Sequence, residues 1–413
     1  MTKSAPKTRY KVCFAVIVLS YAIALKFAIV GTGINLVVVV ASALVVVSNA
    51  NLLLSYRKGE TWTLYVIPLF LLLPLVSNPA TFKLSSFCYG LMFVAVFQVV
   101  TGFLHRDSVA PGEFRRLLAT VVTLYFIMAA IQFALFPFGI EINQIWESYD
   151  GVARVNSLAT EPAYAGIVTI ITFHSYLLLG RRETDGRYVM SDFIKDFKYW
   201  CFVSFIVVTT QSAYAVVYFA ILLLSHVSLK QYFSLFLVAA TIFTFVSLFE
   251  MQSVERLKAL LTSAYSLDIN EMALAEHSGS IRVAPLIILF EGFRLGSIYF
   301  WIGHGAGYSK ELVAREVPGI DAEQWQGGGF IPSHIYNYGI IATGFFFYFL
   351  RKHALAKLLS TESLYLLLIF LTSSFNSQLF WYSILLFSAN KHFSERKMSG
   401  PGESASAELV HAT

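Results

Sequence analysis

The sequence predicts an all-α integral membrane protein, a polytopic helical bundle of about twelve membrane segments. Of the 413 residues, 57% are hydrophobic and only 13% are charged. A soluble chain of this length needs far more charge to cover its surface. Phe and Tyr are abundant, with 37 and 22 residues, which suits lipid contact and aromatic belts at the membrane interfaces.

Eight apolar runs have the length of a single spanning helix, which is about 20 residues. The first follows a basic N-terminal stretch, as in a signal peptide, but it is about 19 residues long and no small-residue cleavage site follows it. We therefore interpret it as a span. The predicted spans are 12–30, 34–54, 62–76, 84–104, 117–136, 162–180, 231–249 and 333–350.

Two further apolar runs, 199–225 and 363–390, are too long for one ordinary span and too short for two. Each contains a polar interruption, at 209–212 in the first and at 373–378 in the second. We expect each run to form a hairpin of two short helices. Polar turns of this kind are tolerated in a membrane only where protein or a water-filled cavity surrounds them.

The basic residues orient these segments. With the N-terminus in the cytoplasm and both long runs folded as hairpins, most of the 30 Lys and Arg residues fall on the cytoplasmic side. Both termini are then cytoplasmic, and two loops face outward, 137–161 and the longer 250–332, whose length suggests a functional element. The expected organisation is a membrane domain, 1–397, followed by a disordered cytoplasmic tail, 398–413.

Several classes of function lack their motifs. The sequence has no phosphate-binding loop, no HExxH motif and no basic run with interleaved aromatic residues. We therefore predict no cofactor, no metal site and no nucleic-acid partner. The three cysteines lie in apolar runs without metal-ligand spacing and are interpreted as core residues. The predicted activity lies within the membrane or at its outer face.

The first candidate residues for function are Arg154 and Glu161, at the end of the shorter outer loop. Pro162 suits the first turn of a helix, where Glu161 either caps that helix or takes part in chemistry. Arg154 either faces solvent and lipid headgroups or holds a phosphate with its two-pronged guanidinium group. The residues alone leave both alternatives open.

The longer outer loop contributes two more arginines. Arg282 follows a Ser-Gly turn in acidic surroundings, and it either contacts a headgroup or binds substrate. Arg294 lies three residues after Glu291, and the simplest interpretation of this spacing is an ion pair on one face of an interfacial helix.

Two histidine motifs follow. His304 lies in a Gly-x-Gly-x-Gly motif at 303–307, where the glycines predict a turn with positive φ and His304 is interpreted as structural rather than catalytic. No strand precedes the motif, so it is not a dinucleotide-binding loop. His334 and Asn337 are three residues apart at the start of the 333–350 span, and we expect them to share a helix face at its outer mouth. His334 there is either a satisfied interfacial side chain or part of a functional site.

In their order and spacing, these motifs resemble those of the O-antigen polymerase (Wzy) and O-antigen ligase family of bacterial membrane glycosyltransferases. The resemblance covers roughly residues 150–345. It is carried by Arg154 before Glu161-Pro162, by Thr210-Gln211-Ser212, by Ser280-Ile281-Arg282, by the glycine motif at 303–307, and by His334, Asn337 and Gly339. Ala213 stands where family members often carry Arg, and Asn337 is not adjacent to His334 as in the ligases, so both departures favour a polymerase.

The resemblance implies a GT-C-like fold that acts at the periplasmic face of the bacterial inner membrane. The implied activity is the metal-independent transfer of a growing glycan from undecaprenyl diphosphate to a lipid-linked repeat unit, with a separate chain-length regulator as a partner. An attacking sugar hydroxyl needs a general base, and the charge that develops on the diphosphate needs cations. The expected residues are His334 or Glu161 as the base, Arg154, Arg282 and Arg294 as diphosphate ligands, and Tyr164, Asn337 and His304 as supporting residues.

Two other functions stay open. One is an O-antigen ligase activity that transfers glycan to a lipid A core or to protein, and the other is a non-enzymatic flippase or transporter of lipid-linked oligosaccharides. A transporter places its polar residues near the midplane and often contains inverted repeats. Here the candidates lie at outer helix ends and in one long loop, and we find no repeat, which disfavours a transporter.

Overall fold

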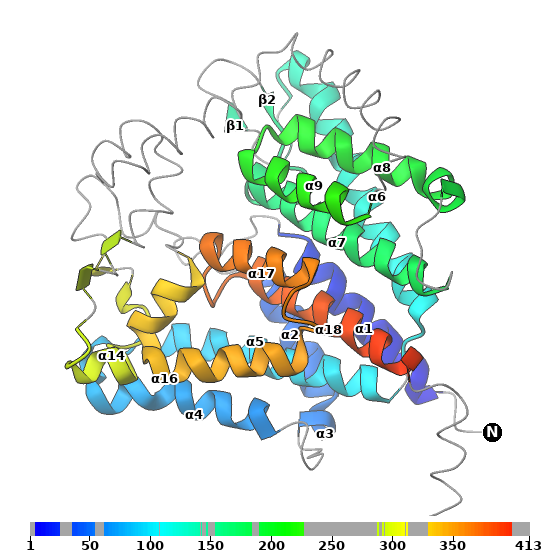
Figure 1. The fold of residues 1–413 in the computed structure, drawn as a ribbon. Coiled ribbons are helices and arrows are strands. Elements are labelled where there is room, and N and C mark those ends of the chain that lie inside the picture. Colours follow the sequence, from blue (N-terminus) through cyan, green and yellow to red (C-terminus); the bar gives the residue numbers. More distant parts are fainter. Residues whose placement is uncertain are drawn as a thin grey trace, which may run out of the picture.

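The chain folds as a bundle of helices in a computed structural model (Figure 1). The structure describes residues 5–24, 35–53, 62–106, 108–140, 142, 146–147, 153–183, 190–226, 287–288, 291–292, 294–309, 311–312 and 329–398. Within these residues, strand pairing is limited to β1 (Trp146–Glu147) and β2 (Ala153–Arg154), which run antiparallel. The predicted all-helical character is therefore confirmed for the bundle itself.

The helices follow one another along the chain with short connections. They are α1 (Ala5–Ala22), α2 (Leu36–Ser48), α3 (Ala50–Leu53), α4 (Trp62–Ser77), α5 (Leu84–His105), α6 (Pro111–Leu135), α7 (Pro162–Glu183), α8 (Met190–Thr210), α9 (Ala213–His226), α14 (Ile298–Ile302), α16 (Phe330–His353), α17 (Thr361–Thr372) and α18 (Gln378–Met398). Two 3-10 turns, Pro79–Thr81 and Phe136–Phe138, follow α4 and α6.

Three described helical segments are long and apolar enough to cross a membrane: Leu84–His105, Pro111–Phe138 and Pro162–Arg181. Four shorter apolar helices match other predicted spans: Leu36–Ser48, Leu64–Val76, Ala213–His226 and Thr361–Thr372. The predicted span 231–249 and the tail from 399 lie outside the described residues. Twelve crossings therefore remain a prediction.

Several helices begin before the apolar run that predicted them. α6 starts at Pro111, where Glu113 Oε2 accepts a hydrogen bond from the backbone N–H of Ala110 at 3.2 Å. α1 likewise starts at Ala5, within the basic stretch. Apolarity marks only the part of a helix that suits lipid, whereas backbone hydrogen bonding continues into polar residues.

Both predicted helix interruptions are confirmed. α8 ends at Thr210 and α9 begins at Ala213, and between them Gln211 has a φ of 47°. α17 ends at Thr372 and α18 begins at Gln378. The polar runs therefore mark chain reversals inside long apolar stretches.

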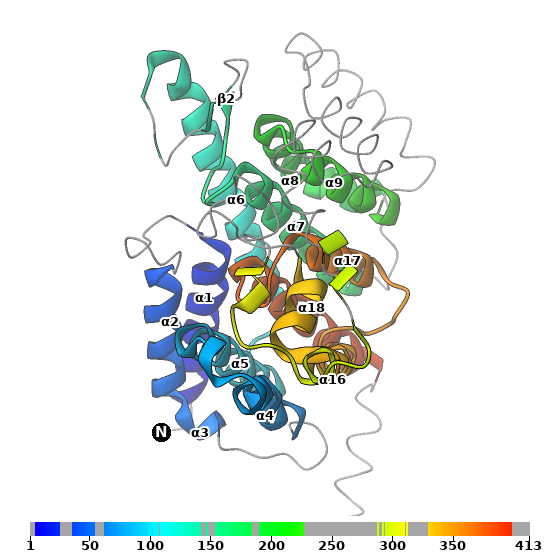
Figure 2. The ribbon, with the colours of Figure 1, turned by 90° about the vertical axis from the view of Figure 1, so that its left-hand side faces the viewer.

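α7 is the most enclosed of the three long apolar segments, and it packs against α6, α8, α9 and α18. Figures 1 and 2 show α8 and α9 lying beside it. Gly166 permits this approach, because a Cβ at that position would overlap the side chain of Ala215. Small residues commonly allow close helix packing in membrane proteins.

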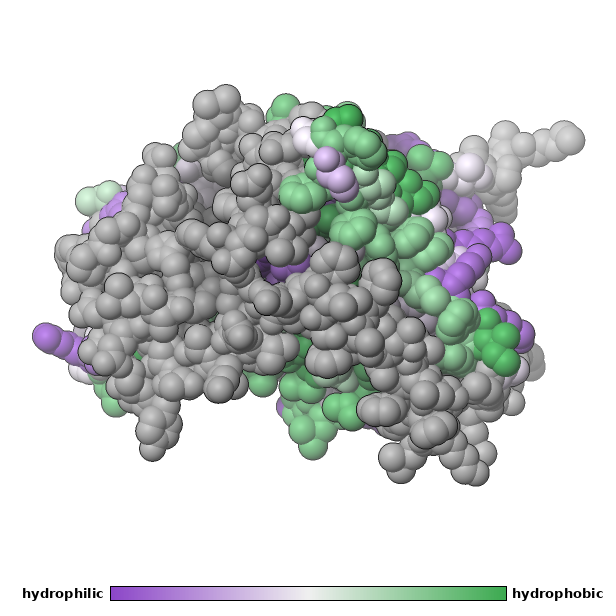
Figure 3. All heavy atoms as spheres, turned by 90° about the horizontal axis from the view of Figure 1, so that it is seen from above, coloured by the Kyte–Doolittle hydropathy of each residue, from purple (hydrophilic) through white to green (hydrophobic). Residues whose placement is uncertain are grey.

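The outside of the bundle is largely apolar. Large side chains such as Leu69, Val76 and Leu224 are exposed rather than packed. Seen from above in Figure 3, green apolar residues dominate the described surface, and hydrophilic ones gather toward the right-hand edge. Apolar exposure on this scale is unusual for a soluble monomer and suits contact with lipid.

Segments that are far apart in the sequence meet at two opposite ends of the bundle. At one end, which we call the loop end, Ala24 N–H bonds to Leu158 O at 2.8 Å, and Lys83 N–H bonds to Ala306 O at 3.2 Å. β2 and α14 lie at this end, on the left of Figure 1. The chain segments predicted to face outward are therefore neighbours.

The opposite end, which we call the terminal end, holds the start of α1 and the last turns of α18 (Figure 1). Here Lys11 Nζ pairs with Glu113 Oε1 at 2.6 Å, and Arg106 Nη1 donates to the Tyr10 hydroxyl at 3.1 Å. Lys391 Nζ donates to the carbonyl oxygen of Lys352 at 2.6 Å. The segments predicted to be cytoplasmic thus also meet one another.

Two buried polar clusters join α7 to its neighbours in the half nearer the terminal end. In one, His174 Nδ1 lies 2.8 Å from His226 Nε2 of α9, and His174 Nε2 lies 3.9 Å from Glu362 Oε1 of α17. In the other, Tyr176 donates its hydroxyl hydrogen to Asp196 Oδ1 at 2.7 Å, and Arg115 Nη2 lies 3.4 Å from the same carboxylate. The guanidinium also lies over the Tyr176 ring, 4.4 Å from its centroid.

The second cluster predicts a graded loss of stability. Asp196→Ala leaves a partly buried guanidinium without its carboxylate and should lower the free energy of unfolding by about 2 kcal/mol. Tyr176→Phe removes one hydroxyl but keeps the ring under Arg115, so its effect should be about 1 kcal/mol. Thermal unfolding of the purified chain in detergent measures both. A larger loss for Tyr176→Phe than for Asp196→Ala contradicts this assignment.

Candidate functional site

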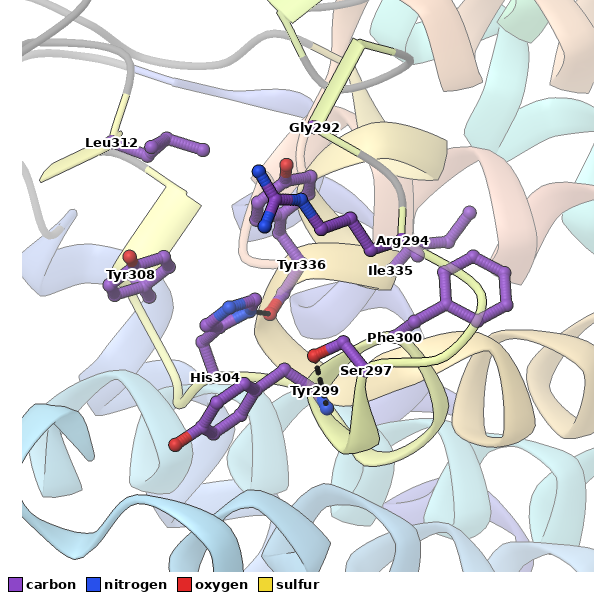
Figure 4. Close-up of a pocket in the computed structure, with 10 residues that line it drawn as sticks. All are labelled: Gly292, Arg294, Ser297, Tyr299, Phe300, His304, Tyr308, Leu312, Ile335 and Tyr336. Atoms are coloured by element: carbon purple, nitrogen blue, oxygen red, sulfur yellow. Dashed lines mark hydrogen bonds between the residues drawn. The ribbon is translucent and has the colours of Figure 1, made fainter.

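A pocket of about 230 Å³ lies at the loop end, between α14 and the first turns of α16 (Figure 4). It combines one guanidinium group with several aromatic rings, and none of its lining residues is acidic. The lining residues are Gly292, Arg294, Ser297, Tyr299, Phe300, His304, Tyr308, Leu312, Ile335 and Tyr336. The pocket therefore brings two predicted site residues, Arg294 and His304, to the same place.

Two glycines set the shape of this region by backbone contact. α16 is interrupted at Gly339, where φ is 83° and ψ is 168°, and Gly303 has nearly the same angles, 85° and 167°. This part of backbone space is essentially restricted to glycine. A Cβ on Gly303 would lie 2.6 Å from Tyr338 Cα, and one on Gly339 would lie 2.6 Å from Ile302 Cα. Each glycine thus makes room for the backbone beside the other.

The interruption of α16 frees carbonyl oxygens, and the glycine motif supplies their donors. His304 N–H donates to Tyr336 O at 2.8 Å, and Gly305 N–H donates to Asn337 O at 3.1 Å. The Asn337 side chain accepts from Ser309 N–H at 2.9 Å. The predicted turn with positive φ is confirmed, and Asn337 is placed as a structural link between the loop and the helix.

His304 stands in a column of parallel rings. Its imidazole stacks on Tyr308 at a centroid distance of 4.5 Å and on Tyr299 at 4.6 Å, and Tyr336 lies 5.4 Å away, nearly parallel. Burial lowers the pKa of the His304 imidazole, while its hydrogen bond to the Tyr336 carbonyl opposes this shift. That carbonyl can only accept, so Nδ1 is the protonated nitrogen of the neutral ring, 3.4 Å from Tyr336 O.

Arg294 does not make the ion pair that its spacing from Glu291 predicts. Helical structure is described at Glu291 and Gly292 but not at Arg294, so the two side chains are not neighbours on one helix. No ion pair joins them among the described residues, and Arg294 lines the pocket instead. The prediction was wrong because the apolar run from 284 does not form one continuous helix.

His334 lies in the interior, in the first part of α16, and is only 1% exposed. Its Nδ1 lies 2.9 Å from Thr343 Oγ1, and the Thr343 hydroxyl donates to Gly339 O at 2.7 Å. Because that hydroxyl has used its hydrogen, Nδ1 must be the donor, and Nε2 of the neutral ring is the acceptor. Nε2 is buried and has no hydrogen-bond partner. His334 is therefore not the fully satisfied side chain that one alternative expected.

Aromatic rings enclose His334. Phe330, Tyr338 and Phe375 lie 4.7, 4.9 and 5.2 Å from it between ring centroids. His334 does not line the pocket, whereas Tyr336, two residues on, does. The side chains of His334 and Asn337 also bond to different parts of the chain, Thr343 and Ser309, so their expected common role at a helix mouth is not seen.

Arg154 lies at the interruption between α8 and α9. Its Nε and Nη2 lie 3.5 Å from the carbonyl oxygens of Thr210 and Gln211, and Val155 N–H donates to Thr209 O at 3.0 Å. A cation at the C-terminal end of a helix is favourable for the helix dipole. The structure therefore gives Arg154 a helix-capping role in addition to any contact with substrate.

Glu161 directly precedes Pro162, the first residue of α7, as predicted. Its backbone carbonyl accepts the first hydrogen bond of the helix from Ala165 N–H at 3.1 Å. Both Glu161 and Tyr164 are partly buried, and Tyr164 packs against the apolar core. Arg282 lies outside the described residues.

Sequence reasoning did not identify Thr343 or the three pocket tyrosines. Thr343 follows Gly339 by four residues, and a hydroxyl at that spacing in a helix can reach the freed carbonyl, so a local signal existed. Tyr299, Tyr308 and Tyr336 carry no local signal, because their rings meet only through the contact between the loop and α16.

The paired glycines predict a specific pattern of stability. Gly303→Ala and Gly339→Ala each force a side chain into glycine-only backbone geometry and into a neighbouring backbone, and each should cost about 2 kcal/mol or more. Gly344→Ala is the control, since a Cβ there meets nothing within 4 Å in the same helix. Thermal unfolding in detergent measures all three. Equal stability of the three variants contradicts the interlocking of the two glycines.

Comparison with known proteins gives no relative for this chain: no protein-family model, no curated protein and no solved structure matches it.

Proposed function

We propose that the chain is a polysaccharide polymerase. It transfers a growing glycan from undecaprenyl diphosphate to a lipid-linked repeat unit at the periplasmic face of the bacterial inner membrane. The observation that carries the proposal is at α16. The same interrupted helix supports a pocket with an arginine on one side and holds a histidine with an unpaired basic nitrogen on the other. Those are the two kinds of group that the transfer needs.

The proposal places the loop end in the periplasm and both termini in the cytoplasm, with twelve membrane segments in a GT-C-like arrangement. The two-ended pattern of contacts supports this topology, since loops expected on one side bond to one another and not to the opposite end. The basic residues Arg351 and Lys352 lie beside Lys391 at the terminal end, which agrees with the positive-inside rule.

In the proposed reaction, a hydroxyl oxygen of the repeat unit attacks the anomeric carbon of the donor glycan. The bond between that carbon and the phosphate oxygen breaks, and its electron pair leaves with undecaprenyl diphosphate. His334 Nε2 takes the hydroxyl proton, because the bond to Thr343 keeps this nitrogen unprotonated in the neutral ring. Glu161 is the second choice for this role.

Positive charge stabilises the leaving diphosphate. Arg294 lines the pocket and is exposed, and it makes no ion pair or side-chain hydrogen bond within the described part of the chain. A guanidinium can bind a phosphate through two parallel hydrogen bonds. Arg154 and Arg282 complete the proposed set of diphosphate ligands, with Arg154 also capping α8.

The unpaired nitrogen of His334 favours a functional role. Leaving a buried acceptor unsatisfied costs about 1–3 kcal/mol, so most buried polar groups have partners and each exception calls for an explanation. A base that must later accept a proton explains it. The rings of Phe330 and Phe375 cover His334 in this structure, so the proposal requires them to separate when substrate binds.

Removal of the base should abolish polymer length without abolishing the protein. In a host that lacks its own gene for the chain, wild type should restore a ladder of glycan lengths on a polysaccharide gel. His334→Ala should leave single repeat units, with a polymerisation rate lower by about 10²–10⁴-fold. Membrane levels of the protein, measured by immunoblotting, control for folding.

Three outcomes of that gel oppose the proposal at different points. A full ladder with His334→Ala, Arg154→Ala and Arg282→Ala contradicts the site. Full-length polymer left on the lipid carrier after gene deletion indicates a ligase. Repeat units trapped on the cytoplasmic side after deletion indicate a flippase.

Thr343 provides a finer test of the role of His334. Thr343→Val keeps the shape of the side chain but removes the oxygen that holds the Nδ1 proton, so the imidazole no longer has a fixed tautomer. Polymerisation should fall by about tenfold or more, to a level between wild type and His334→Ala. Thr343→Ser keeps the hydroxyl and should restore most of the rate. Equal loss in the Val and Ser variants would show that Thr343 serves packing alone.

A further inference from the structure

We infer that the pocket between α14 and α16 binds a single hexose together with the phosphate attached to it. In a lipid-linked donor this is the junction between the first sugar and the diphosphate, so the inference rests on the proposed function and names the part of the substrate that the pocket holds. The argument has three parts: charge, ring surface, and size with rigidity.

Charge selects an anion. Arg294 contributes the guanidinium group, and the lining holds no carboxylate to neutralise it. His304 adds no positive charge at neutral pH, because burial lowers its pKa. Figure 4 shows the Arg294 side chain reaching over the Tyr336 ring, toward the middle of the pocket. An anionic group at that place gains charge-assisted hydrogen bonds that a neutral sugar cannot make.

The stacked rings select the rest of the ligand. Tyr299, His304 and Tyr308 are parallel to within 16°, and their tyrosine hydroxyls add polar groups at the ring edges. A pyranose has one face of C–H groups and a rim of hydroxyls. It can therefore rest on an aromatic surface while its rim makes hydrogen bonds with polar groups around it.

The size of the pocket limits the ligand to one ring. A volume of about 230 Å³ is below the range of roughly 300–1,000 Å³ that drug-sized ligands occupy. The walls are also preorganised. Gly303 lies against the α16 backbone, His304 and Gly305 bond to it, and Ser297 Oγ caps α14 by accepting from Tyr299 N–H at 3.3 Å. A rigid pocket loses little entropy when it binds a small ligand.

The position of the pocket fits this role. Tyr336 belongs to its wall and His334 lies two residues earlier on the inner side of the same helix segment. A sugar phosphate held beside Tyr336 is therefore close to the proposed base along the chain. The pocket would hold the donor at the bond that breaks, rather than at a distant sugar of the glycan.

Ligand-observed NMR on the purified full-length chain in detergent tests the inference, with glucose 1-phosphate, galactose 1-phosphate, glucose and inorganic phosphate as probes. At least one hexose 1-phosphate should bind about tenfold more tightly than glucose or inorganic phosphate alone. Arg294→Ala should lower its affinity by about tenfold, to that of the neutral sugar. Arg116→Ala, which removes an exposed arginine at the terminal end, should leave the affinity unchanged.

Ring variants separate stacking from hydrogen bonding. Tyr308→Phe and His304→Phe keep a ring at each place and should retain most of the binding, whereas Tyr308→Ala should weaken hexose phosphate but not inorganic phosphate. If inorganic phosphate binds as tightly as every hexose phosphate, or if Arg294→Ala changes neither, the inference is overturned.

This test is separate from the test of the reaction. A full glycan ladder in cells together with no binding of hexose phosphate removes the inference and leaves the polymerase. Binding that depends on Arg294 together with normal polymer length after gene deletion removes the polymerase and leaves a sugar-phosphate site.

Discussion

The backbone carbonyls that are freed where a helix is interrupted inside an apolar bundle control the architecture of this protein. Such groups have no water to bond to and must find donors within the chain. At the end of α8 the donor is Arg154, and at Gly339 the donors are the N–H groups of His304 and Gly305. At the end of α1, Gln378 donates to the carbonyls of Tyr21 and Ile23. Each donor comes from a distant segment, so each interruption fastens two parts of the chain together.

This constraint explains why the candidate residues gather at the loop end. The interruptions at Gln211, Gly339 and 373–377 all fall there, and each recruits a loop that carries polar side chains. The glycine motif is needed for its backbone at Gly303 and Gly305, but its position also brings His304 against the tyrosines and beside Arg294. Structural need and the proposed chemistry therefore act on the same few residues. Loss of activity in a variant has to be separated from loss of folding.

Much of this architecture was accessible from the sequence. Long apolar runs predicted the helices, and polar residues within two of them located the chain reversals correctly. The spacing of glycines predicted positive φ at 303–307, and Pro162 correctly marked the start of α7. These signals are local: each depends on the chemistry of a few adjacent residues.

The site itself was predicted only in part, because its geometry depends on contacts between distant residues. Regular spacing implied a pair between Glu291 and Arg294, but the chain does not stay helical between them, and Arg294 turns to the pocket. Likewise, His334 and Asn337 have helical spacing, yet one bonds within α16 and the other bonds to the loop. The role of Thr343 appears only once the kink at Gly339 places a carbonyl beneath its hydroxyl.

Reconstitution tests the central claim most directly. The purified chain would be placed in liposomes with lipid-linked repeat units extracted from a host that lacks the gene, and the glycans would be sized by gel. The account predicts a ladder of increasing length, with one undecaprenyl diphosphate released for each bond formed. Repeat units that stay single, or that move only to a separate acceptor lipid added to the liposomes, contradict it.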